Sequence, residues 1–254
     1  KKKNLKGEIK KIIKARKKKA KQTGGMIFSR MSSARLPGKA MLQIADKKLL
    51  HRVVDRAKCI KEINHICIAT SNNKEDDIIV DMAKSLNIDF FRGSLEDVMS
   101  RAVNAANFFK YDSILRLCGD RPFFCSNIYD NLIKSHKESK SDITTNTFPR
   151  TVPPGLSGEV INIKALEKSL SMTSNPFDRE HVTTHIYNNP DQFSINNVQN
   201  FKSEEIIKLK LVIDNKLDLD RARWIANKIK EKKCKFDTTK IIELAKKWDK
   251  NNLK

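Results

Sequence analysis

The chain has 254 residues and carries 51 lysines and arginines against 30 acidic residues, a formal net charge of +21. This length suits one large α/β domain or two small ones, and the hydrophobic fraction of 39% excludes a wholly disordered chain. No apolar run approaches the roughly 20 residues that cross a bilayer, and no apolar h-region follows the basic N-terminus. We therefore expect no transmembrane segment, no secretory signal and a cytoplasmic location.

The first predicted segment is a basic tail over residues 1–22, which holds twelve lysines and arginines and a single acid, Glu8. Its few apolar residues would form a thin stripe on a basic helix. Two interpretations stay open: a flexible or helical solvated extension, or a weak contact with RNA or an anionic membrane surface. The small residues 23–25 read as a hinge to the main domain, which we place at 23–254.

Short β-rich runs then alternate with helical stretches. Strands are expected at 26–30, 65–70, 88–93, 113–120 and 142–147, and helices at 49–60, 74–86, 95–109 and 128–139. Strands separated by helices of this length indicate βαβ units. The predicted fold is a Rossmann-like three-layer αβα sandwich with a mostly parallel sheet, whose ligands lie at the carboxyl ends of the strands.

A stretch rich in proline and asparagine follows, over residues 149–201. We expect it to be an inserted lid or dimerisation region of loops and short elements. The chain then returns to a strand at 209–214 and closes with helices at 218–232 and 238–250.

The cysteines are odd in number and form no C-x-x-C pair. They lie at Cys59, Cys67, Cys118, Cys125 and Cys234. This pattern predicts structural thiols in a reducing compartment rather than a zinc site.

The most informative run follows the first predicted strand, over residues 30–39. It holds two guanidinium groups, one ammonium group, two hydroxyls and a Pro-Gly turn, which are the donors that a polyphosphate requires. It is neither a Walker P-loop nor a dinucleotide-binding glycine motif. On composition alone, an ordinary basic surface loop is an equal alternative.

This run, R-x-x-S-x-R-L-P-G-K, resembles the N-terminal signature of sugar cytidylyltransferases, in particular the spore-coat polysaccharide biosynthesis (SpsF-type) branch. Further motifs match in order: IATSNNKEDD (68–77), FFRGSLEDVMSRA (90–102), LRLCGDRPF (115–123), PPGLSGEVI (153–161), REHVTTHIY (179–187) and LVIDNKLDLDRAR (211–223). The resemblance also covers the synthetases that make CMP-activated acidic sugars, and it implies a fold of the nucleotide-diphospho-sugar transferase type.

The resemblance implies a nucleotide site. Arg30, Arg35 and Lys39 would hold the β- and γ-phosphates, with Ser32 and Ser33 in support. The nucleoside would contact Thr70, Ser71, Arg92, Gly93 and Ser94. Gly93 would let the base or ribose approach the backbone closely.

Two carboxylates each follow an apolar run, Asp120 and Asp214. By resemblance they would bind Mg²⁺, whose preferred ligands are oxygens. The structural alternatives are a turn or cap for Asp120 and a helix N-cap for Asp214.

The resemblance places the sugar against the predicted lid, at Arg150, Glu159, Arg179, Glu180 and His181. An arginine there could pair with a sugar carboxylate, and the histidine could hydrogen-bond the sugar or act on a proton. The alternative is a structural role for these side chains, as a network of polar contacts at the start of a helix.

Together these residues predict a Mg²⁺-dependent cytidylyltransferase that joins CTP to an acidic sugar for surface polysaccharide and releases pyrophosphate. The resemblance also implies a homodimer. One alternative is a nucleic-acid or membrane-surface binding protein that acts through the basic tail on an inactive scaffold. A second is a nucleotide-sugar-dependent glycosyltransferase, whose D-x-D motif occurs only at residues 218–220.

Overall fold

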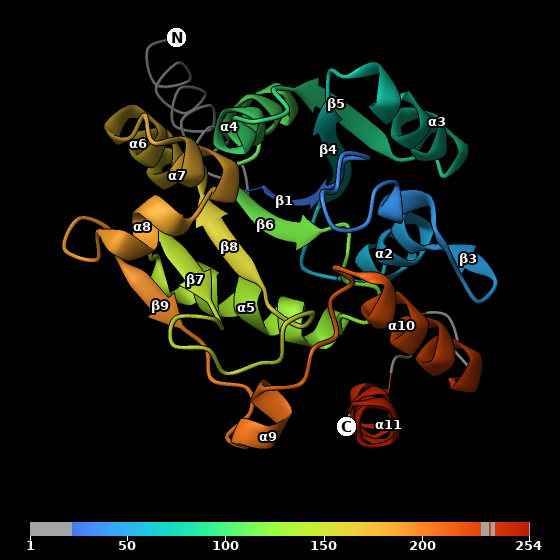
Figure 1. Cartoon of the computed structure of the whole chain (residues 1–254). Helices are drawn as coiled ribbons and strands as arrows, with labels where there is room; N and C mark the ends of the chain where they lie inside the picture. The colour runs from blue at the N-terminus through green and yellow to red at the C-terminus, as the bar shows by residue number, and fades with distance from the viewer. Residues whose placement is uncertain (1–21, 230–233, 235–236, 254) are drawn as a thin grey trace, which may run out of the picture.

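The computed structural model describes residues 22–229, 234 and 237–253. The predicted basic tail therefore lies outside the described residues, except for Gln22. Within the described part, a sheet has the strand order β5-β4-β1-β6-β8-β7-β9 (Figure 1). Its strands are β1 (Thr23–Phe28), β4 (His65–Ser71), β5 (Asp89–Gly93), β6 (Ser113–Cys118), β7 (Ile143–Thr145), β8 (Glu159–Asn162) and β9 (Ile195–Asn197). A small hairpin adds β2 (Gln43–Ile44) and β3 (Lys47–Lys48).

Helices follow most of the strands and make the crossovers. They are α2 (Leu49–Ala57), α3 (Asp77–Ser85), α4 (Val98–Phe109), α5 (Ser126–Ser139), α6 (Ile163–Met172), α7 (Pro176–His181), α8 (Thr184–Asn188), α9 (Glu204–Ile207), α10 (Lys216–Lys228) and α11 (Thr238–Asn252). Two 3₁₀ turns, η1 (Lys39–Met41) and η2 (Lys74–Asp76), follow β1 and β4.

The helices cover the sheet on both sides (Figure 1). The apolar faces of α2, α3, α5, α10 and α11 share one buried cluster, and those of α4, α6 and α8 share the other. β1 pairs in parallel with both β4 and β6, and β4 pairs in parallel with β5. This arrangement confirms the predicted αβα sandwich with a mostly parallel sheet, and it brings the ends of β1, β4 and β6 to one edge.

The segment 149–201 is more than a lid. It contributes β8, which pairs antiparallel with both β6 and β7, and β9 at the sheet edge. It also supplies α6, α7 and α8. Three of the four residues of β8 are buried, so the strand belongs to the core although prolines and asparagines surround it in sequence.

Two local predictions were wrong. Residues 23–25 are not a hinge but the buried start of β1, where Gly24 leaves room for Tyr111: a Cβ at Gly24 would lie 2.2 Å from Tyr111 Cε2. Residues 209–214 are not a strand. They form an extended segment in which every second side chain is buried, and this burial produces the alternating pattern. The segment is hydrogen-bonded to loops: Leu211 N donates to Pro154 O, and Ile213 N donates to Asp120 O.

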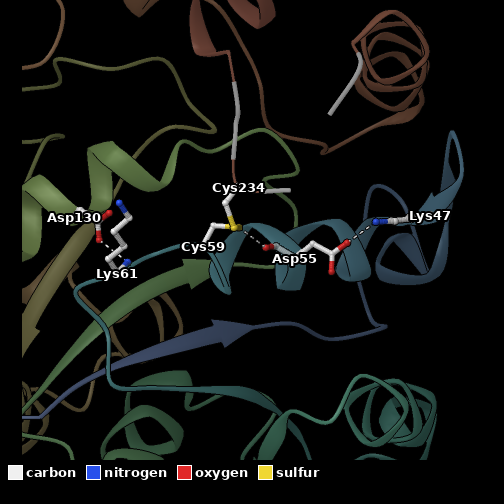
Figure 2. Close-up of a disulfide and its surroundings, with 6 residues drawn as sticks. All are labelled: Lys47, Asp55, Cys59, Lys61, Asp130 and Cys234. Atoms are coloured by element: carbon white, nitrogen blue, oxygen red, sulfur yellow. Dashed lines mark hydrogen bonds and ion pairs between the residues drawn. A yellow bond between two sulfur atoms is a disulfide. The ribbon is translucent and has the colours of Figure 1, made fainter. Parts of the chain in front are cut away.

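The cysteine prediction was also wrong in part. Cys59, just after α2, forms a disulfide with Cys234 between α10 and α11, with 175 residues between them in sequence (Figure 2). Sequence spacing carries no signal for a pair so distant. Cys67, Cys118 and Cys125 are free thiols, and burial raises the pKa of Cys67 to about 12.

None of the helices in the described residues has the length and apolar character needed to cross a bilayer.

Candidate active site

One buried carboxylate, that of Asp76, holds the loop that follows β1 against the end of β4. Asp76 has no exposed surface, and its Oδ1 accepts from Met31 N at 2.7 Å. Its Oδ2 accepts from the backbone N and the hydroxyl of Ser71 at the end of β4. The loop closes at Gly38, whose φ of 70° suits a residue without a Cβ, and Lys39 begins η1 directly after it. This anchoring aims the basic side chains of the loop at the carboxyl edge of the sheet.

A cavity of about 600 Å³ opens at this edge. The predicted site residues that line it are Arg30, Ser33, Arg35, Lys39, Asp120, Glu180, His181 and Asp214. They come from the loop after β1, the end of β6, α7 and the loop before α10, so the structure brings together segments far apart in sequence.

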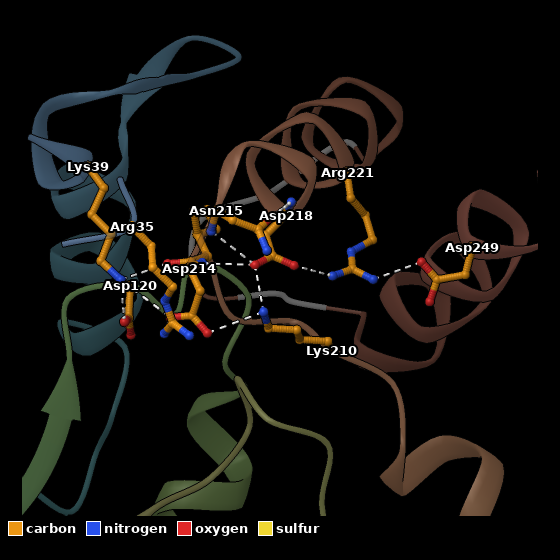
Figure 3. A network of polar contacts seen from close by, with 10 residues as sticks. Arg35, Lys39, Asp120, Lys210, Asp214, Asn215, Asp218, Arg221 and Asp249 are labelled. Carbon is orange, nitrogen blue, oxygen red and sulfur yellow. Dashed lines mark hydrogen bonds and ion pairs between the residues drawn. The ribbon is translucent and has the colours of Figure 1, made fainter. Parts of the chain in front are cut away.

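The two carboxylates converge on one ammonium group (Figure 3). Lys39 Nζ lies 2.8 Å from Asp120 Oδ2 and 3.6 Å from Asp214 Oδ1. The same Nζ donates to Ile213 O at 2.7 Å. Arg35 reaches Asp214 Oδ1 at 3.1 Å from the exposed side. Asp120 and Asp214 therefore lie on the same side of the molecule as the loop, as the sequence predicted.

Asp214 is not the helix cap that was its structural alternative. Asn215 caps α10: its side chain accepts from Asp218 N, and Asp218 accepts from Asn215 N. This capping box leaves the Asp214 carboxylate free to face the cavity. Burial would raise the pKa of Asp214, but Lys210, Lys39 and Arg35 outweigh it and hold the pKa below its ordinary value.

The network continues behind Asp214 (Figure 3). Lys210 bridges Asp214 and Asp218, at 3.2 and 2.7 Å. Arg221 then joins Asp218 to Asp249 on α11. This chain of ion pairs links the cavity wall to the two C-terminal helices.

The chemistry of the two carboxylates fits a hard divalent cation. Asp120 and Asp214 already share one positive charge, and carboxylate oxygens are the ligands that Mg²⁺ and Mn²⁺ prefer. Among the described residues, no group of three or more histidines, cysteines or acids could hold a metal. A cation held by two carboxylates would complete its shell with water and phosphate oxygens, as is usual for Mg²⁺ beside nucleotides.

The predicted nucleoside residues do not line the cavity. Thr70 and Ser71 are fully buried, and Ser71 bonds to Asp76. Arg92 pairs with Asp77 and donates to two backbone carbonyls. Ser32 and Ser94 also lie outside the lining residues, and the space over Gly93 is filled: a Cβ there would lie 2.9 Å from Arg101 Cγ.

The predicted sugar residues divide into two groups. Glu180 and His181 line the cavity; Glu180 pairs with Arg30 at 2.7 Å, and His181 packs edge-on against Phe177. The others lie outside the lining residues. Arg150 is exposed and donates to Ser157 Oγ at 2.9 Å.

Arg179 and Glu159 instead support the elements around the cavity. Arg179 joins α7 to the N-cap of α4 through Asp97, at 2.9 Å, and also donates to two carbonyls. Glu159 is buried and accepts from Arg116, Thr183 and Tyr187. Burial would raise the pKa of Glu159, but the charge of Arg116 and these hydrogen bonds hold it below its ordinary value.

Two arginines on the cavity were missed by sequence reasoning. Arg116 lies on β6 and pairs with Glu159 at 2.6 Å. Arg101 lies on α4 and is 2% exposed. Both arginines lie within motifs matched in the sequence, 115–123 and 90–102. Arg101 is also a charged residue on the apolar face of α4, between the buried Met99 and Ala102.

Comparison with known proteins decides the family. The cytidylyltransferase family model matches residues 25–243, which is most of the chain. The chain belongs to the cytidylyltransferase family. It is 32% identical over 212 residues to the spore coat polysaccharide biosynthesis protein SpsF of Bacillus subtilis, a match that covers 82% of this chain and 87% of that protein.

Two further similarities agree with the family. A 3-deoxy-manno-octulosonate cytidylyltransferase of Acinetobacter baumannii is 29% identical over 114 residues, which cover 43% of this chain and 44% of that enzyme. The structure of a cytidylyltransferase from Leptospira borgpetersenii superposes with a TM-score of 0.82 at 29% identity, over 89% of this chain and 94% of that one. The resemblance stated from the sequence motifs is thereby confirmed.

The cavity of this cytidylyltransferase has two chemically different sides. The loop after β1 and the two aspartates form one side, where cations and carboxylates lie within 3.6 Å of each other. Glu180 and His181 of α7 contribute to the other side, and the ion pair between Glu180 and Arg30 joins the two sides. The cavity therefore presents cations and carboxylates on one side and an acid and an imidazole on the other.

Proposed function

We propose that this cytidylyltransferase transfers the cytidylyl group of CTP to a hydroxyl of an acidic sugar and releases pyrophosphate. The main support is the convergence of Asp120 and Asp214 on Lys39 beside the loop 30–39. The names of two relatives, SpsF and 3-deoxy-manno-octulosonate cytidylyltransferase, support a sugar acid for surface polysaccharide as the second substrate.

Arg30, Arg35 and Lys39 would hold the β- and γ-phosphates. Pyrophosphate gains negative charge as it leaves, so cations fixed there stabilise the transition state more than the bound substrate. Ser33 adds a hydroxyl on the same cavity wall. A nucleoside that approaches the end of β4 would have to use main-chain groups there, because the side chains of Thr70 and Ser71 are buried.

Asp120 and Asp214 would hold Mg²⁺. When bound, the ion would neutralise charge on the α-phosphate and lower the pKa of the attacking hydroxyl. The two carboxylates suit this role because their backbones are joined: Ile213 N donates to Asp120 O at 3.0 Å, which keeps the two loops together.

Glu180 and His181 would orient the sugar. Its hydroxyl oxygen attacks the α-phosphorus, the bond to the β-phosphate breaks, and the hydroxyl loses its proton, for which the His181 imidazole is the candidate acceptor. Positioning accounts for much of the rate in such transfers, so the packing of His181 on Phe177 would matter. We also propose a homodimer and a cytoplasmic site of action, where CTP is available.

The test is pyrophosphate release by the full chain. CTP, UTP, GTP and ATP are compared with 3-deoxy-manno-octulosonate and other sugar acids, with Mg²⁺ and with a chelator. We expect release only with CTP, a sugar acid and the metal. Failure to bind any nucleotide, and no release with any pair, would refute the proposal.

Asp120→Asn should reduce turnover at least about 100-fold while the melting temperature stays near that of the wild type, because the asparagine oxygen can still accept from Lys39, which keeps Asp214 as its charged partner. Asp81→Asn, which alters an aspartate 75% exposed on α3, is the matched control and should leave turnover unchanged. Retained turnover in Asp120→Asn would remove Asp120 from the site.

The two alternatives receive less support. Residues 1–21, on which the nucleic-acid or membrane interpretation rests, lie outside the described residues. The D-x-D motif of the glycosyltransferase alternative lies in α10, where Asp218 is 4% exposed and paired with Arg221 and Lys210 rather than facing the cavity.

A further inference from the structure

The cations around the cavity are paired with carboxylates, with one exception. Of the five lysines and arginines among its described lining residues, Arg30 pairs with Glu180, Arg35 and Lys39 with the two aspartates, and Arg116 with Glu159. Arg101 has no carboxylate within ion-pair distance among the described residues. Its Nη1 donates to Ser94 O at 3.0 Å, and its buried Nε has no hydrogen-bond partner.

Burying such a charge is unfavourable. Arg101 is 2% exposed, and its nearest aromatic ring, that of Phe28, lies 6.0 Å away. Burial, together with the positive charge of Arg30, lowers the pKa of Arg101 to about 10, and the negative charge of Asp76 offsets only part of this effect. A buried charge is usually compensated by a partner, so the missing partner has to be explained.

The local backbone holds two guanidinium groups next to each other. Arg101 donates to Ser94 O, and Arg30 donates to the next carbonyl, Leu95 O, at 3.4 Å. Gly93 leaves room for the aliphatic part of the Arg101 side chain, because a Cβ at residue 93 would lie 2.9 Å from Arg101 Cγ. Carbonyls orient both groups without neutralising either. Two adjacent guanidinium groups on a cavity wall form a binding site for an oxyanion.

We propose that Arg101 binds an oxyanion of a substrate, together with Arg30, and so positions that substrate in the cavity. This inference rests on the proposed function. The oxyanion is either a phosphate group of the nucleotide or the carboxylate of the sugar acid; both offer two oxygens to a guanidinium fork. Glu180, which holds Arg30 in the free protein, is displaced or moves aside when the oxyanion arrives.

The test measures binding by calorimetry on the full chain, without turnover. Pyrophosphate, CTP with Mg²⁺, and 3-deoxy-manno-octulosonate are titrated into the wild type, Arg101→Met and Arg101→Lys. Arg52→Met is the matched control, because Arg52 is an arginine 5% exposed on α2 that pairs with Asp46 away from the cavity.

We expect Arg101→Met to weaken one class of ligand by about 10- to 100-fold, the effect of losing a charged hydrogen bond. Arg101→Lys should weaken binding less than Arg101→Met does, because lysine keeps the positive charge. If Arg101→Met weakens the binding of pyrophosphate and CTP, the oxyanion bound by Arg101 is a phosphate group of the nucleotide. If it weakens the binding of the sugar acid alone, the oxyanion is the sugar carboxylate. Arg52→Met should bind all three ligands as the wild type does.

The stability of the free protein gives a second readout. Arg101→Met should melt no lower than the wild type, since no carboxylate loses its partner, whereas a structural arginine would lower the melting temperature when removed. Affinities within twofold of the wild type for all three ligands in Arg101→Met would overturn the inference. A wild type that binds none of them would instead refute the proposed function.

Discussion

At the scale of single residues, four of the five lysines and arginines that line the cavity are paired with carboxylates, and Arg101 is the exception among the described residues. Lys39 neutralises Asp120 and Asp214, and Glu180 holds Arg30. On the proposed function, a polyanion and a divalent cation would replace these partners. Lys39 would then have two roles: it occupies the position proposed for the metal between the carboxylates, and it would turn towards phosphate when that position is taken.

This exchange makes a prediction for Lys39→Met. Without the ammonium group, the two aspartates repel each other, so the variant should bind Mn²⁺ more tightly than the wild type in the absence of nucleotide, by about fivefold or more. Affinity for CTP should fall, because a phosphate contact is lost. Both are measured by paramagnetic resonance and calorimetry.

Lys84→Met, a change on the exposed face of α3, should alter neither affinity. Equal Mn²⁺ affinity in Lys39→Met and the wild type would mean that Lys39 does not compete for the position between the carboxylates.

At the scale of elements, α10 is responsible for where Asp214 points. The capping box of Asn215 and Asp218 fixes the first turn of this helix, and Asp218 Oδ2 also accepts from Asp214 N at 3.0 Å. The start of α10 and the backbone of Asp214 are therefore held by the same side chain, that of Asp218.

Asn215→Ala should lower the free energy of unfolding by about 0.5 to 2 kcal/mol, the usual cost of losing an N-cap. It should also reduce turnover, because Asp214 loses its fixed direction. Asp237→Ala removes the N-cap of α11, because the Asp237 side chain accepts from Lys240 N; Asp237 is not among the residues that line the cavity. Asp237→Ala should lower the free energy of unfolding by a similar amount and leave pyrophosphate release unchanged. Urea unfolding measures the loss of stability, and the release assay measures the loss of turnover.

The element scale also explains what sequence reasoning could and could not predict. The alternation of strands and helices predicted the sheet, and apolar runs that end in an acid predicted Asp120 and Asp214. Period-two burial in 209–214 imitated a strand, because an extended loop that buries alternate side chains has the same pattern. β8 was hidden because proline and asparagine surround it. Arg101 lies within the matched motif 90–102, but the motif assigned it no role; its place on an apolar helix face was a second signal.

At the scale of the whole molecule, the disulfide closes the chain on itself. Cys59 and Cys234 join the end of α2 to the region before α11, across 175 residues of sequence (Figure 2). A cross-link across so many residues restricts the conformations of the unfolded chain. The disulfide should therefore add between about 2 and 5 kcal/mol to the free energy of unfolding. In the cytoplasm, where disulfides are rare, the bond would be open to reduction.

The expected result is a lower melting temperature of the wild type in dithiothreitol, measured by calorimetry in parallel with a thiol count. Cys234→Ser should melt near the reduced wild type and should not respond to the reductant. A wild-type melting temperature unaffected by full reduction would show that the cross-link does not restrict the unfolded chain.

The backbone bond between Ile213 and Asp120 also determines how the enzyme should lose activity on heating. This link holds the loop of Asp120 to the loop of Asp214, whereas α11 connects to them less directly, through Asp249, Arg221 and Asp218. Loosening of the first turn of α11, well before Asp249 in the chain, would leave the link unchanged. Catalysis should accordingly persist through early, local melting and stop abruptly only when the sheet itself comes apart.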